Sequence, residues 1–195
     1  MSTEETARRL DAVVEYFNRA VDVYPLMRRR ATGDKVNALN VVDYGVGGLT
    51  RQVYMQGCWH LGPDEAVLHE IELPEECFYW NVQAGNLFWE TLDPTFRLSS
   101  VNGHQAKIDP DGRVRVVFAP RDPGLANWVD TGGLEWGDMT WRWLRCSSVP
   151  RITHRVATVD EIRHHVPDGC VRVTPEQRSA QLRERVLCSQ LRRKW

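Results

Sequence analysis

The sequence lacks a long apolar run. No stretch approaches the roughly 18 apolar residues that a transmembrane helix requires. The polar opening MSTEETARRL also has no apolar centre of the kind found in signal peptides. We therefore expect no association with a membrane.

An excess of positive charge is missing as well. Lys and Arg number 25 against 26 Asp and Glu, which gives a formal net charge of −1. Nucleic-acid-binding domains usually carry a basic stripe. The two short basic runs, 28–30 and 192–194, lie near the ends of predicted helices, where the helix dipole favours cations. The sequence therefore predicts no nucleic-acid partner.

Paired cysteine motifs are also absent. The five cysteines are odd in number and form no CxxC pair, so their spacing indicates neither a disulfide framework nor a zinc site. We expect the cysteines to be thiols that serve as small apolar side chains or have no specific role, in a reduced, cytoplasmic protein. We also expect no metal and no other cofactor. The cysteines are Cys58, Cys77, Cys146, Cys170 and Cys188.

The first feature that is present is a helix signal in residues 1–45. Ser2 and Glu5 have the spacing of a capping box, and Pro25 is expected to end or kink the helix. Between them, apolar residues recur at three- and four-residue spacing, which predicts an amphipathic helix followed by a linker. These residues are Leu10, Val13, Val14, Phe17, Val21 and Tyr24.

Residues 46–150 consist of short strand-like runs separated by turns. In QAKIDPDGRVRV, Pro110 and Gly112 have the turn chemistry of a hairpin. Many short antiparallel strands at this spacing predict a sandwich or a barrel. The expected strands are LTRQVYMQ, AVLHEIEL, CFYWNVQ, FRLSSVN, RVRVVFAP and DMTWRWLRC.

Helix signals return in residues 151–195. Capping-box spacing occurs at Thr158 and again at Thr174, where Pro175 takes the favoured first helical position. The last helix is expected to bury Ala180, Leu187 and Leu191. The chain is therefore predicted to be mainly β, an antiparallel β-sandwich or barrel with an N-terminal amphipathic helix and C-terminal helices.

Aromatic and amide side chains gather between residues 79 and 143. Indoles supply flat contact area, and amides both donate and accept hydrogen bonds, which suits a polar or amphipathic ligand. The alternative is that the Trp residues fill the core and the Asn residues fasten loops. The candidate ligand-binding residues are Trp80, Asn81, Asn86, Trp89, Asn102, Gln105, Asn127, Trp128 and Arg142.

One segment, RDPGLANWVDTGG at 121–133, combines turn chemistry with a large aromatic residue. We interpret Trp128 as an anchor that fastens this loop to the sandwich, and Asp130 as a cap for neighbouring amides. Arg142 is expected to pair with an anionic group of the ligand. The alternative for Arg142 is an ion pair with Asp122 or Asp130.

The run YWNVQAGNLFWETLD, followed by RLSSVNGHQAKIDPDGRVRVVFAPRDPGLANWVDTGG and then TWRW, resembles a bacterial family known as domain of unknown function 1214. The likeness spans about residues 54–143 and depends on an ordered series of short motifs. It implies a jelly-roll-like antiparallel β-sandwich and names no reaction. Members of that family often carry a further domain ahead of this one, so the resemblance leaves open whether an upstream domain or a partner chain completes the site.

No motif identifies a reaction, so the sequence leaves open whether the protein is an enzyme. GxSxG is absent. Carboxylates such as Glu70 with Glu72, or Asp122 with Asp130, would suit acid–base catalysis, but solvated strands commonly carry such pairs. The histidines that could join the glutamates around a metal are His60, His69 and His104, and no HxH pair occurs among them.

Two functions remain open. The first is the binding, with or without modification, of a small polar or amphipathic organic ligand in a pocket lined by aromatic and amide groups. The second is a non-catalytic interaction or accessory subunit that docks a partner protein, or a second copy, through its terminal helices. Exposure of the apolar face of the first helix would favour the second function.

Overall fold

The computed structural model describes residues 2–33, 35–42 and 51–192, and for residues 24–32 it describes the backbone alone. The side chains of the basic run 28–30, and residues 193 and 194 of the other run, therefore lie outside the described part of the chain. So does the side chain of Tyr24.

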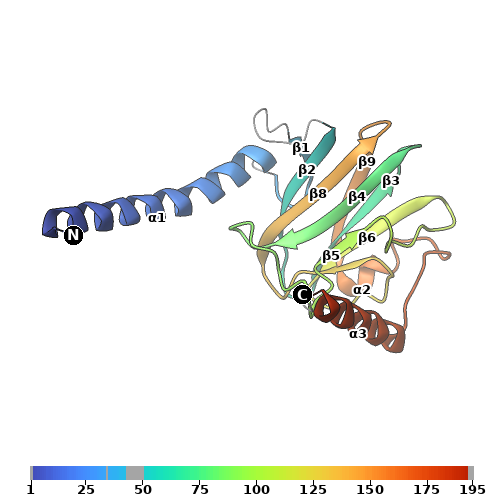
Figure 1. Ribbon diagram of the computed structural model, residues 1–195. Coiled ribbons are helices and arrows are strands. Elements are labelled where there is room, and N and C mark those ends of the chain that lie inside the picture. The colour runs from blue at the N-terminus through green and yellow to red at the C-terminus, as the bar shows by residue number, and fades with distance from the viewer. Residues whose placement is uncertain (1, 34, 43–50, 193–195) are drawn as a thin grey trace.

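Within the described residues, nine strands form two sheets, which confirms the predicted mainly β sandwich (Figure 1). The five-stranded sheet has the order β1-β2-β8-β4-β5, and the four-stranded sheet has the order β7-β6-β3-β9. Helix α1 (Thr3–Thr32) precedes the sheets, and α2 (Val159–Ile162) and α3 (Pro175–Leu191) follow them. The strands are β1 (Asn40–Val42), β2 (Gln52–His60), β3 (Glu65–Glu72), β4 (Cys77–Gly85), β5 (Ser100–Asn102), β6 (Arg113–Ala119), β7 (Trp128–Asp130), β8 (Trp136–Cys146) and β9 (Arg151–Thr158).

The main core fills the space between the sheets. Successive residues of a strand point to opposite faces, so Trp141 and Trp143 of β8 both point inward, where their rings stack with centroids 5.8 Å apart. Trp80 of β4 stacks 5.3 Å from Trp143. Gly137 makes room for one more indole, because a Cβ at this position would lie 2.0 Å from the ring of Trp59. Large aromatic rings on the five-stranded sheet therefore dominate the main core.

A second core covers the outer face of the four-stranded sheet. Leu68 of β3 and Val117 of β6 pack there with Ile162 of α2 and with Val166 in the segment that follows it. All four side chains are buried. The C-terminal residues therefore shield one outer face of the sandwich from water.

The segment 121–133 contains a strand that the sequence does not predict. Strand β7 pairs in parallel with β6, with Trp128 opposite Val117. The Trp128 side chain lies in the second core, and its Nε1 donates to the carbonyl oxygen of Ala119 at 3.0 Å. Trp128 thus fastens the loop, as expected. The glycines and Pro123 around Trp128 are typical of turns, so the sequence pattern does not predict this strand of three residues.

The sheets extend beyond the expected limits of 46–150. Strand β9 pairs with β3 along its whole length, in a segment where the sequence indicates helices. Most side chains of β9 are exposed, so no alternating apolar pattern marks it. At the other end of the chain, β1 pairs with β2 ahead of residue 46.

Helix α1 begins as predicted and ends later. The Ser2 Oγ accepts a hydrogen bond from the Glu5 amide at 3.1 Å. The helix then continues through Pro25 to Thr32, so of the two outcomes expected at Pro25, an end or a kink, the end is wrong. A proline inside a helix removes one donor and its ring crowds the preceding turn, so the residue alone does not favour continuation of the helix past Pro25. Among the described residues, no helix combines the length and the apolar character needed to cross a bilayer.

Helix α3 begins at the capping box predicted at Thr174. Its predicted inner stripe is wrong, because Ala180, Leu187 and Leu191 are exposed. The helix instead docks through a buried arginine, Arg178. The Arg178 Nε lies 2.9 Å from Oδ2 of Asp122, and the guanidinium lies 5.3 Å from the centre of the Trp128 ring. An ion pair and a cation–π contact therefore fix the orientation of α3.

Two cysteines that are distant in sequence meet at the end of the β4–β8 pair. Cys77 lies directly opposite Cys146, and the two form a disulfide. The expectation that all five cysteines are thiols is therefore wrong for this pair, whose juxtaposition depends on strand register. Of the remaining cysteines, Cys58 and Cys170 are buried and Cys188 is exposed.

Candidate functional site

The outer face of the five-stranded sheet carries a block of polar side chains. The central strand β8 lies between β2 and β4, and its pairing aligns two rows of outward side chains across the three strands. One row consists of Gln56, Thr140 and Gln83, and the other consists of Tyr54, Arg142 and Asn81. Asp138 lies on β8 two residues before Thr140, on the same face of the sheet. We call these seven residues the polar face.

The polar face is shielded although it lies on the outside of the sandwich. The outward side of an antiparallel sheet usually meets solvent. Here Gln56 is 2% exposed, Asp138 3% and Thr140 5%. The other four residues of the polar face are half-buried. Because a buried polar group without a hydrogen bond is costly, the bonding of these side chains is informative.

Several hydrogen bonds run within the polar face. The Thr140 hydroxyl donates to Oδ2 of Asp138 at 2.5 Å and accepts from Nε2 of Gln56 at 3.5 Å. Nη1 of Arg142 donates to Oε1 of Gln83 at 3.3 Å. Two of these distances are at the long end of the range for hydrogen bonds. The network is therefore loosely held around Gln56 and Arg142.

Two amide oxygens of the polar face have no partner. Oε1 of Gln56 and Oδ1 of Asn81 are both buried and accept no hydrogen bond. Exchanging the oxygen and nitrogen of Gln56 would not help, because the Thr140 hydroxyl already donates to Asp138. Asn81 uses its Nδ2 to donate to the Tyr79 hydroxyl at 3.1 Å. Leaving a buried acceptor unpaired costs about 1–3 kcal/mol, so both oxygens are directed toward donors that the described residues do not supply.

Loop 86–91 closes over one end of the polar face. Trp89 Nε1 donates to Oδ1 of Asp138 at 3.0 Å, and Gln83 Nε2 donates to the Thr91 hydroxyl at 3.1 Å. The side chain of Asn86 accepts hydrogen bonds from two backbone amides of the same loop. Trp89 has a φ of 61°, a left-handed conformation that is unfavourable for a bulky residue. The loop therefore holds a strained tryptophan against a carboxylate of the polar face.

Four of the nine predicted ligand-binding residues gather at this site. Asn81 and Arg142 lie opposite each other within the polar face. Trp89 closes its end, and Asn102 of β5 lies next to Asn81. Oδ1 of Asn102 is already occupied by two backbone amides of the turn that follows it. Of these four, Asn102 uses its side-chain oxygen for its own turn, which leaves Asn81, Trp89 and Arg142 as the candidates for contact with a ligand.

The other five predicted residues lie elsewhere or serve the loops. Trp80 belongs to the main core and Trp128 to the second core, so the two indoles do not share a pocket. Asn127 is buried and bonds to backbone groups of two neighbouring segments. Asn86 stabilises its own loop, and Gln105 is exposed.

The sequence did not single out Gln56, Asp138 or Thr140 as site residues. One signal was available in DMTWRWLRC, where Asp138, Thr140 and Arg142 alternate with large apolar residues and must share the outward face. That alternation places three residues on one strand. Only the pairing with β2 brings Gln56 beside them, and pairing cannot be read from a local pattern.

The four carboxylates considered for acid–base catalysis are each paired with a different arginine. None of these arginines is Arg142, so its alternative ion pair with Asp122 or Asp130 is wrong. The pairs are Glu70–Arg115 at 2.9 Å, Glu72–Arg113 at 3.0 Å, Asp122–Arg178 at 2.9 Å and Asp130–Arg97 at 2.9 Å.

The most buried of these arginines, Arg115, serves a structural network. It contacts Glu70, Asp109 at 2.7 Å and Asp111 at 2.6 Å. The hydrogen bond from Arg115 holds the pKa of the Asp111 carboxyl down at about 2. Because Asp109 also accepts from the amide of Val171, the network connects β3, β6 and the C-terminal segment. The charged side chains of this network therefore pair with one another and stabilise the fold.

His69 lies in the main core, away from the carboxylates. Its ring lies 5.7 Å from Trp141 and 5.6 Å from Phe118, and both ring nitrogens lack partners. Burial lowers the pKa of His69 to about 3, with a smaller effect from the charge of His154. Glu70 points to the opposite face of β3 and cannot share a metal with His69. Among the described residues, no group of three His, Cys, Asp or Glu side chains could hold a metal ion.

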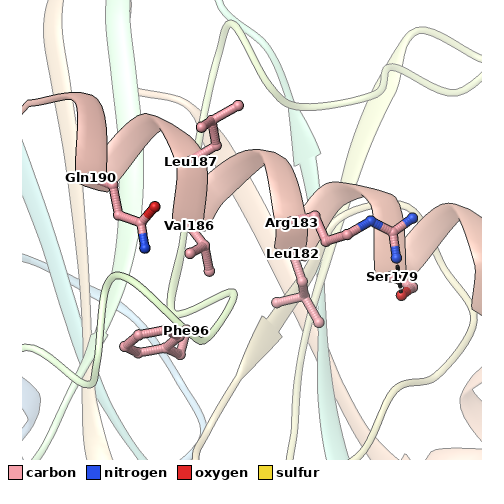
Figure 2. A pocket seen from close by; sticks show the side chains of 7 residues that line it. All are labelled: Phe96, Ser179, Leu182, Arg183, Val186, Leu187 and Gln190. Carbon is pink, nitrogen blue, oxygen red and sulfur yellow. Dashed lines mark hydrogen bonds between the residues drawn. The ribbon is translucent and has the colours of Figure 1, made fainter.

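A separate pocket of about 390 Å³ lies between α3 and Phe96 (Figure 2). Leu182 and Val186 point from the helix toward Phe96, while Nη1 of Arg183 donates to the Ser179 hydroxyl at 2.8 Å. The pocket offers mainly apolar contacts, and none of the nine predicted residues lines it. Its lining residues are Phe96, Ser179, Leu182, Arg183, Val186, Leu187 and Gln190.

Comparison with known proteins supports the fold. No family model matches the chain, and no curated protein matches it. An uncharacterised protein of known structure from Burkholderia cenocepacia is 34% identical, with a TM-score of 0.66 over 70% of this chain and 39% of that protein. The VPA0106 protein from Vibrio parahaemolyticus is 16% identical, with a TM-score of 0.43 over 53% of this chain and 30% of that one. The chain thus spans well under half the length of either solved structure.

Proposed function

We propose that the protein binds a small polyhydroxylated organic ligand that carries an anionic group, and that the polar face is its site. The observation that carries this proposal is the pair of buried amide oxygens, Gln56 Oε1 and Asn81 Oδ1, that accept no hydrogen bond. Hydroxyl groups of a ligand are donors of the right size and strength for both.

Arg142 explains why the ligand should be anionic. It lies beside Asn81 across the β4–β8 pair and is half-buried. Among the described residues, its hydrogen bond is the one from Nη1 to Gln83. The remaining edge of the guanidinium can donate two parallel hydrogen bonds to a carboxylate or phosphate, which is the strongest pairing that arginine makes.

We propose loop 86–91 as the cover of the site. Its indole contact to Asp138 is made by Trp89 in a strained backbone conformation. Moving Trp89 away from Asp138 would relieve that strain and uncover one end of the polar face. Strained residues of this kind concentrate at ligand sites.

The proposal is limited to binding. Asp138 is the carboxylate of the polar face, and both of its oxygens already accept hydrogen bonds, from Thr140 and from Trp89. A carboxylate whose two oxygens both accept hydrogen bonds is suited to orienting the side chains that donate to it. Modification of the ligand therefore gains no support from this carboxylate.

Isothermal titration calorimetry tests the proposal, with D-gluconate as the first probe and a panel of sugar acids and hydroxy acids after it. Gln56→Met removes one unpaired acceptor at nearly constant volume. We expect it to weaken the binding of the best probe at least tenfold, because a site built to bond a hydroxyl loses that bond. Gln105→Met is the matched control and should leave binding unchanged. Failure of the whole panel to bind, or equal binding by Gln56→Met, would contradict the proposal.

Membership of the family known as domain of unknown function 1214 is also a proposal. It is supported by the ordered motifs from Tyr79 to Trp143 and by the sandwich that those motifs form.

The cytoplasm is the proposed compartment, supported by the exposed thiol of Cys188, since exposed thiols persist where thiols are kept reduced. The Cys77–Cys146 disulfide argues for an oxidising compartment. Alkylation of thiols in freshly lysed cells decides between the two. Five alkylated cysteines would support the cytoplasm, and three would contradict it.

A further inference from the structure

Helix α1 presents a row of large apolar side chains to solvent. Leu10, Val14 and Phe17 are 61%, 59% and 67% exposed, and Val21 is 43% exposed. The helix contacts β1 and β2, and Figure 1 shows its N-terminal part running away from the sandwich. An apolar row on a helix that leaves the body of the protein marks an association surface.

The accessible surface of the chain is larger than its mass predicts. A compact monomer of 22.5 kDa should expose about 9,500 Å². The chain exposes 12228 Å², an excess of about 2,700 Å² relative to that scaling. A stable interface takes about 800 Å² from each partner. The excess is therefore larger than the area that one partner contributes to such an interface.

We propose that α1 pairs with α1 of a second copy of this chain in an antiparallel arrangement, which makes the protein a homodimer. The four exposed apolar residues are spaced four, three and four apart, which is the pattern of a two-helix seam. A two-fold axis between Val14 and Phe17 places Val14 of one copy against Phe17 of the other, and Leu10 against Val21. The row is therefore complementary to itself, as a two-fold interface requires.

A lipid surface fits α1 less well than a second copy. Helices that lie on membranes are rich in Lys and Arg on their polar face. Residues 3–23 contain five Asp and Glu against three Arg. The net charge of this segment is therefore negative, which opposes binding to anionic lipids.

The first test is the mass of the full chain in solution, measured by analytical ultracentrifugation over a range of concentrations. We expect a dimer that Phe17→Glu dissociates, with a dissociation constant raised at least about 100-fold because both copies lose the contact. Tyr16→Glu is the matched control, since Tyr16 is 74% exposed and lies off the seam. A monomer at all concentrations overturns the proposal, and so does a dimer that survives Phe17→Glu.

Cross-linking tests the direction of the helices. In a Cys188→Ser background, Leu10→Cys and Val21→Cys proteins are oxidised separately and as a mixture. The antiparallel register predicts a covalent dimer in the mixture and little in either protein alone. Cross-linking by Leu10→Cys alone would overturn the antiparallel register. Binding of the chain to phosphatidylserine vesicles in place of dimerisation would overturn the choice of partner.

Discussion

Asn81 lies directly opposite Arg142 on the outer face of the five-stranded sheet, yet the two side chains do not satisfy each other. Nη1 of Arg142 donates to Gln83 instead, and Oδ1 of Asn81 accepts nothing. A cation and an unpaired acceptor thus stand side by side on a shielded surface. This combination fits an external molecule that is anionic at one point and a hydrogen-bond donor at another.

Gln56→Met should stabilise the fold while it removes ligand binding. The variant loses a long hydrogen bond to Thr140 and removes a buried acceptor without a partner. We expect the free energy of unfolding to rise by about 1 kcal/mol, measured by urea denaturation. Gln105→Met, at an exposed position, should have no effect. A loss of stability in Gln56→Met would show that Gln56 is held in place for the fold, and would contradict our account of the polar face.

Arg115→Met should be strongly destabilising. It leaves Asp109 buried without its cation, and removing one partner of a buried ion pair typically costs about 3–5 kcal/mol. The same substitution at Arg113, two residues away in a more exposed pair with Glu72, should cost less than about 1 kcal/mol. Chemical denaturation of both variants measures the difference. Similar losses in the two would contradict the structural role of Arg115.

His69→Leu should reduce the sensitivity of the fold to acid. His69 has a pKa of about 3 in the folded protein because it is buried, whereas its ordinary value is 6.5. Between these values the unfolded chain binds the proton and the folded chain does not, so the stability of the natural protein falls as the pH falls.

From pH 7 to pH 5 the natural protein should therefore lose about 2 kcal/mol relative to His69→Leu. Urea denaturation at the two pH values and one protein concentration measures this change. The exposed residue His104 provides the control substitution. If His69→Leu and the natural protein lose the same free energy of unfolding between pH 7 and pH 5, the burial of a neutral imidazole does not cause the loss of stability in acid.

Gly137→Ala should disrupt the main core. A Cβ at this position would lie 2.0 Å from the Trp59 ring, closer than any real contact. We expect a loss of at least about 3 kcal/mol, since overpacking of a rigid core is costly. Gly62→Ala is the matched control, because its Cβ would lie 3.4 Å from the nearest atom, a flexible Glu65 side chain. Thermal unfolding of both variants makes the comparison, and an unchanged melting temperature for Gly137→Ala would contradict the described packing.

Local patterns were enough to predict the start of helix α3 and the sides of the β8 side chains. The alternation in DMTWRWLRC places Trp141 and Trp143 inside and Arg142 outside, and the capping box at Thr174 marks the start of α3. These features depend on residues within a few positions of one another. They could therefore be inferred from the sequence alone.

Features that depend on distant pairing could not be predicted. Trp80 and Trp128 look alike in sequence, but register places Trp80 between the sheets and Trp128 on the outer face of the four-stranded sheet. Gln56 becomes part of the polar face only because β2 pairs with β8. Ala180, Leu187 and Leu191 of α3 are exposed, whereas Arg178 of the same helix is buried against Asp122, 56 positions earlier in the chain.

Nuclear magnetic resonance of the side-chain amides tests the central claim most directly. The probe is a titration of the labelled full chain with D-gluconate and the related sugar acids and hydroxy acids. We expect the amide signals of Gln56 and Asn81 to shift in proportion to one another while that of Gln105 stays in place. If millimolar concentrations of every compound leave the Gln56 and Asn81 signals unmoved, the polar face is not a site for ligands of this class.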